Sequence, residues 1–225
     1  GHSLGEWIAL AAVGALEFED GLRLVRHRGE AMRDAGRSEP GGMGVIIGLS
    51  DEAVGEIVDQ INGDGQEVWI ANYNSPGQVV IAGKGEALER ALALAKENKA
   101  KYAIPLPVSV ACHTPLMTAA VDALRPVLED TPFYPPWAPV VSNAVASPLS
   151  DPADLRAALL QQLTSPVRWV ESVRVMAEGQ VASMLEVGPK AVISTLVKRI
   201  DRSIAFQGVT DLPSLERFDV EALQN

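Results

Sequence analysis

A serine between two glycines opens the chain and is the first group that could do covalent chemistry. The pentapeptide Gly1-His2-Ser3-Leu4-Gly5 has the pattern G-x-S-x-G, and an apolar, Ala-rich run follows it over residues 6–16. In a nucleophile elbow this pattern places the serine on a sharp strand-to-helix turn, beside unpaired N–H groups of the helix N-terminus. Such donors stabilise an oxyanion, and the Leu4 N–H is the natural candidate. The pentapeptide alone also fits an ordinary turn before a helix, so other residues must decide.

A serine nucleophile needs a base to take its proton, and the sequence contains three histidines. His2 lies inside the pentapeptide, and His27 falls on the predicted outer face of a helix. His113 ends an extended segment and precedes Thr114-Pro115, which is typical of a helix start. Junctions between strands and helices carry the chemistry of α/β folds. His113 is therefore the best general-base candidate, and a histidine that only caps the following helix is the alternative.

An arginine lies on the wrong face of the predicted helix over residues 17–35. The apolar stripe of this helix contains Leu24, Val25 and Met32, and Arg28 falls among them. A partly buried guanidinium without a protein partner would bind an anion, and its planar fork matches a carboxylate. This pattern favours a carboxylate clamp. A salt-bridged or snorkelling structural arginine is the alternative.

The composition bounds the class of protein. With 225 residues, 47% of them hydrophobic, the chain can bury the core of one large domain or two small ones. A net charge of −10 argues against a nucleic-acid binder, which would carry a basic face. The single cysteine, Cys112, fits a cytoplasmic location. It is a rival nucleophile to Ser3, but side-chain alternation turns it away from His113, which favours a core residue. No apolar run is long enough for a membrane helix, and we expect neither a metal nor a cofactor.

Residues 42–106 have the pattern of a small inserted module. Strands are predicted at 43–49, 68–73, 78–82 and 102–106, and helices at 51–61 and 86–97. This βαββαβ order is the ferredoxin-like arrangement. We therefore predict an α/β protein with a large catalytic subdomain, residues 1–41 and 107–225, and a ferredoxin-like small subdomain, residues 42–106.

The large subdomain takes its remaining elements from the second half of the chain. They are predicted as helices at 151–163 and 165–177, strands at 140–142 and 182–187, the latter being the final strand, and a helix after the turn at 188–190. A nucleophile elbow normally follows a strand, and here the sequence begins at the elbow. We therefore expect the given sequence to be part of a larger protein and to lack the N-terminal part of the large subdomain.

Together these stretches resemble one family, the malonyl-CoA:acyl-carrier-protein transacylases and the acyltransferase domains of fatty acid and polyketide synthases. The matching stretches run in family order along nearly the whole chain: GHSLGEW at 1–7, RLVRHRGEAM at 23–32, NYNSPGQVVIAG at 72–83, PLPVSVACHTPLM at 105–117, QQLTSPVRW at 161–169 and EVGPKAV at 186–192. The resemblance implies a hydrolase-like α/β large subdomain with a parallel sheet and an inserted ferredoxin-like subdomain. This agrees with the strand order predicted above.

The resemblance also implies roles for individual residues. Ser3 matches the family nucleophile, His113 the catalytic histidine and Arg28 the arginine that binds the malonyl carboxylate. Gln162 lies where the family places the residue whose backbone carbonyl orients the histidine, and Leu4 matches one oxyanion-hole donor. The family pair of serine and histidine has no acidic third member. We further expect substrate contacts from Met32, Asn72, Asn74 and Asn143.

The implied reaction is a ping-pong transfer of malonyl from malonyl-CoA to the phosphopantetheine thiol of acyl carrier protein, in fatty acid biosynthesis. We expect a stand-alone, monomeric enzyme with these two partners and with no nucleic acid or membrane. The family also carries an N-terminal G-Q-G-S-Q segment whose glutamine gives the second oxyanion contact. The given sequence has no such motif, and we expect that segment to lie on another chain or to have been omitted.

Other functions remain open at this point. A polyketide-synthase acyltransferase, a serine thioesterase or esterase, and a carrier-binding module without catalysis are the alternatives. An acidic carrier would dock on basic side chains, and the candidates are Lys190, Lys198 and Arg199, with Lys99 and Lys101 as further ones. Solvated surface cations are the alternative for each of them.

Overall fold

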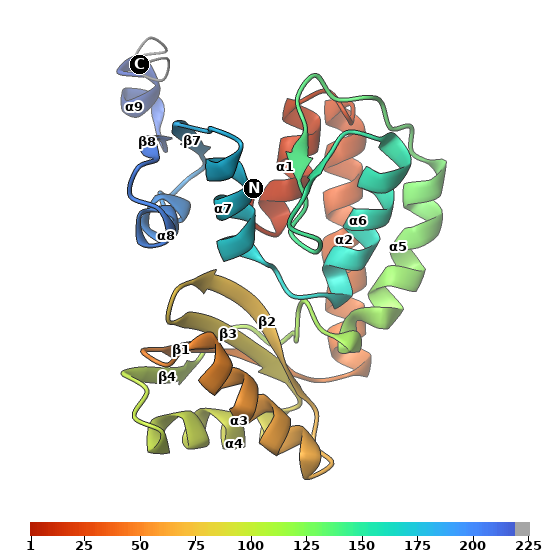
Figure 1. Cartoon of the computed structure of the whole chain (residues 1–225). Coiled ribbons are helices and arrows are strands. Elements are labelled where there is room, and N and C mark those ends of the chain that lie inside the picture. Colours follow the sequence, from red (N-terminus) through yellow and green to blue (C-terminus); the bar gives the residue numbers. More distant parts are fainter. Residues whose placement is uncertain (219–225) are drawn as a thin grey trace.

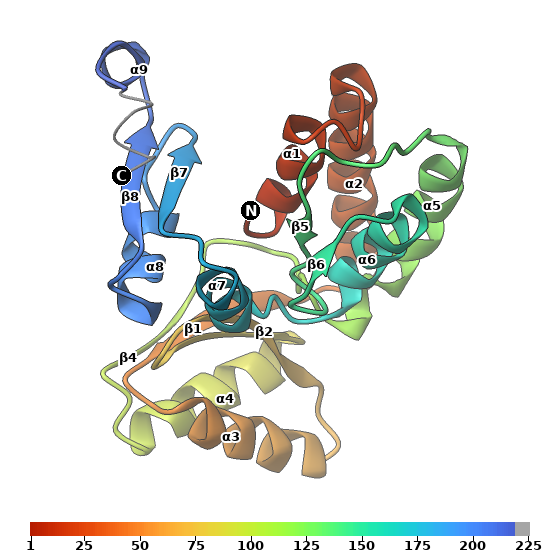
Figure 2. The ribbon, with the colours of Figure 1, turned by 45° about the horizontal axis from the view of Figure 1, so that its top comes forward.

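The computed structural model describes residues 1–218 (Figures 1 and 2). Its largest sheet has 4 antiparallel strands in the order β2-β3-β1-β4. The strands are β1 (Gly42–Ile47), β2 (Val68–Ser75), β3 (Gln78–Gly83) and β4 (Tyr102–Pro105), and helices α3 (Asp51–Gly63) and α4 (Gly85–Glu97) cover one face. This confirms the predicted ferredoxin-like arrangement. The exact division into two subdomains stays a prediction, and residues 219–225 of the larger one lie outside the described residues.

The central strand β3 shows why both faces of this sheet are covered. Val79 and Ile81 belong to the apolar cluster beneath α3 and α4, whereas Val80 and Ala82 belong to the larger cluster of the helical part. Because successive side chains of a strand point to opposite faces, one continuous apolar run serves two cores. The sheet therefore lies between its own helices and the part of the molecule that carries the elbow.

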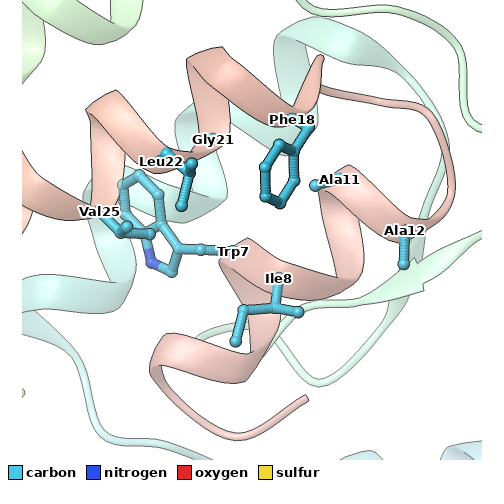
Figure 3. Close-up of a pocket in the computed structure, with 8 residues that line it drawn as sticks. All are labelled: Trp7, Ile8, Ala11, Ala12, Phe18, Gly21, Leu22 and Val25. Atoms are coloured by element: carbon cyan, nitrogen blue, oxygen red, sulfur yellow. The ribbon is translucent and has the colours of Figure 1, made fainter. Parts of the chain in front are cut away.

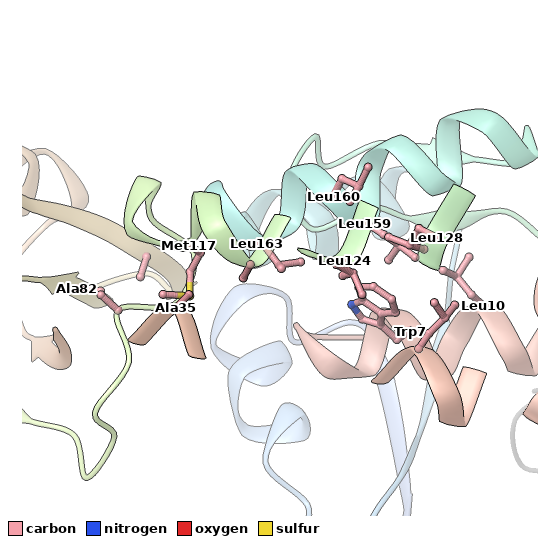
Figure 4. Close-up of a cluster of buried hydrophobic side chains, with 14 of the residues drawn as sticks. Trp7, Leu10, Ala35, Ala82, Met117, Leu124, Leu128, Leu159, Leu160 and Leu163 are labelled. Carbon is pink, nitrogen blue, oxygen red and sulfur yellow. The ribbon is translucent and has the colours of Figure 1, made fainter. Parts of the chain in front are cut away.

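The helical part consists mainly of α1 (Leu4–Ala12), α2 (Phe18–Ser38), α5 (Thr118–Asp130) and α6 (Pro152–Thr164). Their shared core runs from Trp7 past Leu124 and Leu163 to Ala82 of the sheet (Figure 4). Helix α2 extends beyond its predicted end at residue 35, so the loop before the sheet is shorter than expected. This continuous core fixes the elbow relative to the sheet.

The C-terminal part differs from the prediction in one strand. It contains α7 (Trp169–Glu178), β7 (Ser183–Val187), α8 (Ile193–Ile200), β8 (Ala205–Val209) and α9 (Leu212–Glu216). β7 was expected to be the final strand, but β8 pairs with it in parallel after the α8 crossover. The short, mixed sequence of β8 gives little strand signal, and its pairing partner supplies the order. Within residues 1–218, β7 and β8 form the only parallel pair of named strands.

Short elements connect these parts around the elbow. β5 (Val140–Val141) and β6 (Pro148–Leu149) form a small antiparallel pair, and the 3₁₀ helix η1 (Pro115–Met117) leads into α5. His113 was expected at the end of an extended segment, but it lies in a turn with φ of 63°. That left-handed conformation is uncommon outside glycine, and it turns the chain sharply before η1.

An apolar hollow of about 280 Å³ opens between α1 and α2 (Figure 3). Apolar residues line it, among them Ile8, Phe18 and Leu22, whose side chains are exposed. It therefore offers no nucleophile or charge. In the described part of the chain, no helix has the length and apolar character needed to cross a membrane.

Candidate active site

Ser3 stands immediately before α1 in a strained backbone conformation, with φ of 50° and ψ of −107°. Its neighbours explain why the motif needs glycine. A Cβ added to Gly1 would lie 2.1 Å from the carbonyl group of Gly5, a distance that no side chain tolerates. Gly1 thus lets the chain fold back against the Gly5 backbone and present Ser3 at the helix start, whereas a Cβ at Gly5 itself would meet no atom of the described residues within 4 Å.

His113 contacts the nucleophile directly. Its Nε2 lies 2.9 Å from Ser3 Oγ, and its Nδ1 lies 2.7 Å from the Gln162 backbone oxygen. Because a carbonyl oxygen only accepts, Nδ1 carries the proton and donates, which leaves the Nε2 lone pair free to accept the Ser3 hydroxyl proton. The geometry is that of a general base with its tautomer fixed by the main chain.

Burial sets the charge of this histidine. His113 is only 4% exposed, and desolvation lowers its pKa to about 4, against the smaller opposing effect of the Gln162 carbonyl. The positive charge of Arg28 lowers the pKa further. His113 is therefore neutral at pH 7 and can accept a proton. Within residues 1–218 no carboxylate bonds to it, so the carbonyl of Gln162 takes the place of an acidic third member.

Arg28 reaches the same oxygen from α2. Its Nη2 donates to Ser3 Oγ at 3.0 Å, and its side chain lies beside the Trp7 ring, 5.8 Å from the centroid. It is 8% exposed, and desolvation lowers its pKa. Among residues 1–218 no acidic side chain forms an ion pair with it, and its buried Nε has no hydrogen-bond partner. The guanidinium group of Arg28 can therefore bind an anion beside Ser3 Oγ.

The model of the acyl transferase domain family matches residues 1–217.

The chain belongs to the acyl transferase domain family.

The resemblance deduced from the motifs is therefore confirmed. The malonyl CoA-acyl carrier protein transacylase of Bacillus subtilis is 43% identical over 217 residues, which are 96% of this chain and 68% of that protein. Its counterpart of Salmonella typhimurium is 46% identical over 200 residues, 89% of this chain and 64% of that protein. The chain thus spans about two thirds of the length of these relatives.

Similarity to solved structures extends to the whole fold of this acyl transferase domain. A malonyl transacylase solved in complex with its type II polyketide-synthase acyl carrier protein superposes with a TM-score of 0.92 at 43% identity. The match covers 100% of this chain and 71% of that chain. The predicted α/β acyltransferase fold is confirmed by this agreement.

In this acyl transferase domain the Asn143 side chain bonds to the backbone of the elbow on both sides of His2. Its Oδ1 accepts from the Ser3 N–H at 2.6 Å, and its Nδ2 donates to the Gly1 carbonyl at 2.8 Å. The side chain is fully buried. A substrate contact was expected from Asn143, but both ends of its amide are committed to the elbow backbone. Its position after a short strand gave no sign of this role.

The other predicted substrate residues lie on β2 and α2. Asn74 on β2 hydrogen-bonds His2 Nε2 at 2.8 Å, and Asn72 is buried on the same strand, bridged to Val167. Asn74 thus ties the sheet to the elbow, and Asn72 ties it to the segment before α7. Met32 packs against the main core and, with Arg28, lines a groove of about 670 Å³ beside the loop before His113. Its predicted substrate contact stays a prediction.

Leu4 is the first residue of α1. Within residues 1–218 its N–H makes no hydrogen bond, whereas the next N–H groups bond back to His2 and Ser3. An open donor one residue after the nucleophile is suited to an oxyanion. The role implied by the resemblance is compatible with this geometry.

Glu6 is the residue that sequence reasoning missed. It is buried, and its Oε2 accepts from the Asn143 N–H at 3.0 Å and from Gln162 Nε2 at 2.7 Å. The pattern Ser3-x-x-Glu6 suggests a helix capping box, which was a signal for its position. The structure has no side-chain cap at Ser3, and Glu6 points inward instead.

The predicted carrier-binding residues lie on the surface of the C-terminal part. Lys198 and Arg199 are exposed in the last turn of α8 and line a hollow of about 480 Å³ with Arg202. Arg199 Nη1 also donates to Gln78 Oε1 at 2.8 Å. Lys190 is exposed in the segment between β7 and α8. In the described part of the chain no cluster of histidine, cysteine and acidic side chains could hold a metal ion.

Proposed function

We propose that this chain carries the active site of a malonyl-CoA:acyl-carrier-protein transacylase. The meeting of His113 Nε2 and Arg28 Nη2 at Ser3 Oγ carries the proposal, since it joins a base and an anion site at one nucleophile. The names of the relatives support malonyl-CoA and acyl carrier protein as partners and fatty acid biosynthesis as the setting. A cytoplasmic location belongs to the proposal, supported by the single cysteine.

The first half-reaction transfers malonyl to the serine. Ser3 Oγ attacks the thioester carbonyl carbon of malonyl-CoA while its proton passes to His113 Nε2. The Leu4 N–H donates to the oxyanion of the tetrahedral intermediate. When the intermediate collapses, the carbon–sulfur bond breaks and the CoA sulfur takes the proton from His113. A malonyl ester on Ser3 and free CoA remain.

The second half-reaction reverses these steps with another thiol. The phosphopantetheine thiol of the carrier gives its proton to His113, and its sulfur attacks the ester carbonyl carbon. The carbon–oxygen bond then breaks, and Ser3 Oγ recovers the proton from His113. The reaction needs no cofactor of its own, because CoA and phosphopantetheine arrive with the substrates.

Arg28 links substrate binding to the base. It is the buried cation that would pair with the free carboxylate of the malonyl group. Since its positive charge lowers the pKa of His113, a bound carboxylate would offset that charge and make His113 more basic. The correct substrate therefore helps to prepare the base, which a neutral acetyl group does not do.

A polyketide-synthase setting is the second candidate. It is favoured by the similarity to a malonyl transacylase solved with a type II polyketide-synthase carrier. The chemistry at Ser3 is the same in both settings, and only the carrier differs.

Partition of the malonyl group tests transfer against hydrolysis. Malonyl-CoA is incubated with the protein and holo-carrier, and malonyl-carrier and free malonate are measured by mass spectrometry. We expect malonyl-carrier as the main product, and apo-carrier without phosphopantetheine should yield none. Release of malonate at the same rate with either carrier would identify a thioesterase instead.

The carrier surface is tested by charge reversal. Lys198→Glu with Arg199→Glu should raise the carrier KM about 3- to 10-fold, because each exposed ion pair contributes up to about 1 kcal/mol. The KM of malonyl-CoA should not change. Lys99→Glu with Lys101→Glu, at the turn before β4, is the matched pair and should leave both KM values unchanged. The reverse pattern would move the docking surface to that turn.

A further inference from the structure

We infer that Glu6 is a positioning residue whose single oxygen, Oε2, aligns the nucleophile and the base with each other; the inference rests on the function proposed above. Glu6 touches neither reacting group. It bonds to Asn143 and to Gln162, and these in turn hold Ser3 and His113. Two branches from one acceptor therefore reach both partners of the proton transfer.

The first branch runs to the base. The Gln162 side chain has four partners. Its Oε1 accepts from Trp7 Nε1 at 3.0 Å and from Arg28 Nη2 at 3.5 Å, and its Nε2 donates to Glu6 and, at 3.1 Å, to the Ser3 carbonyl. An amide held by a donor on one side and acceptors on the other cannot flip. The backbone oxygen of the same residue receives the His113 Nδ1–H. Loss of Glu6 therefore frees the residue that orients the base.

The second branch runs to the nucleophile. The Asn143 N–H donates to Glu6, which fixes the loop after β5. From that loop the Asn143 side chain clamps Gly1 and Ser3. The strained backbone of Ser3 persists only where neighbouring groups hold it, and this clamp is one of them. Glu6 thus holds Ser3 in place through Asn143 and His113 in place through Gln162.

The position of the oxygen matters more than the charge. Both donors, Asn143 N and Gln162 Nε2, bond to the same oxygen atom, Oε2. The charges that shift the pKa of His113 come from Arg28 and His2, and Glu6 is not among them. Burial is the largest effect on Glu6 itself and raises its pKa, and no cation among residues 1–218 forms an ion pair with it. Burying an ionised carboxylate without a paired cation costs free energy. The site therefore uses Glu6 as a hydrogen-bond acceptor at a fixed position and not as a charge.

Two substitutions of similar size separate acceptor from charge. Glu6→Gln can place an amide oxygen at the Oε2 position and keep both hydrogen bonds, while the Ser142 hydroxyl that contacts Glu6 rotates to accept from the new amide. Glu6→Met fills the same space without an acceptor. We expect kcat within about threefold of wild type for Glu6→Gln, and about 10- to 100-fold lower for Glu6→Met, as a misalignment of about 1 Å would give. The KM of malonyl-CoA should change far less than kcat does in Glu6→Met, because Arg28 keeps its direct hydrogen bond to Ser3 Oγ and contacts the Gln162 side chain only at 3.5 Å.

A control variant accounts for lost stability. Asn62→Ala removes a side chain that bonds both backbone groups of Val68 in the ferredoxin-like part, residues 42–106. It should lower Tm and leave kcat unchanged. If Glu6→Met lowers kcat no more than Asn62→Ala does, the positioning role is wrong. If Glu6→Gln is as slow as Glu6→Met, the acceptor account is wrong as well.

A spectroscopic measurement keeps this test independent of the proposed reaction. The His113 Nδ1–H bonded to the Gln162 carbonyl should give a protected downfield proton resonance in the wild type and in Glu6→Gln. We expect it to shift or broaden in Glu6→Met and to remain in Asn62→Ala. A wild type that shows the resonance but transfers no malonyl would contradict the proposed function alone. An unchanged resonance in Glu6→Met would overturn the role of Glu6.

Discussion

The elbow region and the ferredoxin-like part both contain buried side chains, but different interactions hold them in place. Beneath Ser3, the side chains of Glu6, Asn143 and Gln162 are buried polar groups joined by hydrogen bonds. Under the sheet, apolar side chains such as those of Ile46, Val79 and Ile81 pack in one cluster with the buried apolar residues of α3 and α4. The first region has directional contacts, and the second has a non-directional apolar core.

This difference predicts which substitutions change the rate of acyl transfer and which change the free energy of unfolding. A hydrogen-bond network fixes atoms in direction as well as distance, and a site for proton transfer needs both. An apolar core gains its free energy from buried area and tolerates small shifts. We therefore expect substitutions near the elbow to lower the rate of acyl transfer, and substitutions under the sheet to lower the free energy of unfolding.

Removing the base should have the largest effect on rate. In His113→Ala nothing accepts the Ser3 proton, so formation of the acyl-serine should fall by about 10²–10⁴-fold. Quenched-flow measurement of the adduct gives this rate. Since His113 is neutral and forms no ion pair within residues 1–218, the protein should still fold, and the lost rate should far exceed any loss of folded protein shown by Tm. A fall of less than tenfold would place the base elsewhere and break the contrast between the two regions.

Removing the anion site should come next. Arg28→Ala should lower acylation by malonyl-CoA by about 10²-fold, because a buried ion pair that loses one partner costs about 3 kcal/mol or more. Acylation by acetyl-CoA should stay the same or rise, since the acetyl group leaves the arginine charge unpaired in the wild type. The ratio of kcat/KM for the two thioesters is the measurement. An unchanged ratio would mean that Arg28 is only a structural partner of Ser3.

The opposite result is expected under the sheet. Ile81→Ala in β3 removes a fully buried side chain and should lower the free energy of unfolding by about 2–5 kcal/mol. The rate of acyl-serine formation per folded molecule should stay within about twofold. Urea unfolding and active-site titration measure the two quantities. A large loss of rate in a folded protein would show that the sheet core also positions the site.

The smallest expected effect is the dependence of the free energy of unfolding on pH, to which buried His113 contributes. An unfolded histidine titrates near pH 6.5, whereas folded His113 titrates at about 4. Between these values the unfolded chain binds a proton that the folded chain cannot, so stability falls as pH drops from about 6.5 to about 4. At about 1.4 kcal/mol per pKa unit, the loss reaches about 3 kcal/mol.

A substitution isolates this contribution. His113→Gln should lose less stability over the same pH range, as measured by urea unfolding. The pKa of His2 is also lowered by burial, but His2 is present in both proteins and cancels in the comparison. Equal losses in the two proteins would show that His113 is not a buried neutral base.

The sequence was sufficient to predict the three side chains that meet at the candidate site. Ser3 lies in a motif whose spacing describes a turn, and Arg28 interrupts an apolar stripe. His113 was selected from only three histidines. The βαββαβ order of residues 42–106 also followed from short apolar runs and from apolar residues at helical spacing. In each case a local pattern of residue types carries the information.

The role of Glu6 could not be predicted because it depends on contacts between distant parts of the chain. Glu6 is separated from Asn143 by 137 residues and from Gln162 by 156, and its sequence position suggests only a helix cap. β8 gains its order from pairing with β7, and the turn at His113 comes from a left-handed backbone that no pattern marks. Sequence patterns describe faces and turns, whereas a hydrogen-bond network appears only after folding.

The central claim is that Ser3, His113 and Arg28 form one acylation site, and intact mass tests it most directly. The protein is incubated briefly with malonyl-CoA beside a Ser3→Ala control, and the mass of each chain is recorded. We predict one malonyl adduct on the wild type and none on the control. An adduct that persists in Ser3→Ala, or its absence from a wild-type chain that is folded by circular dichroism, would contradict the account.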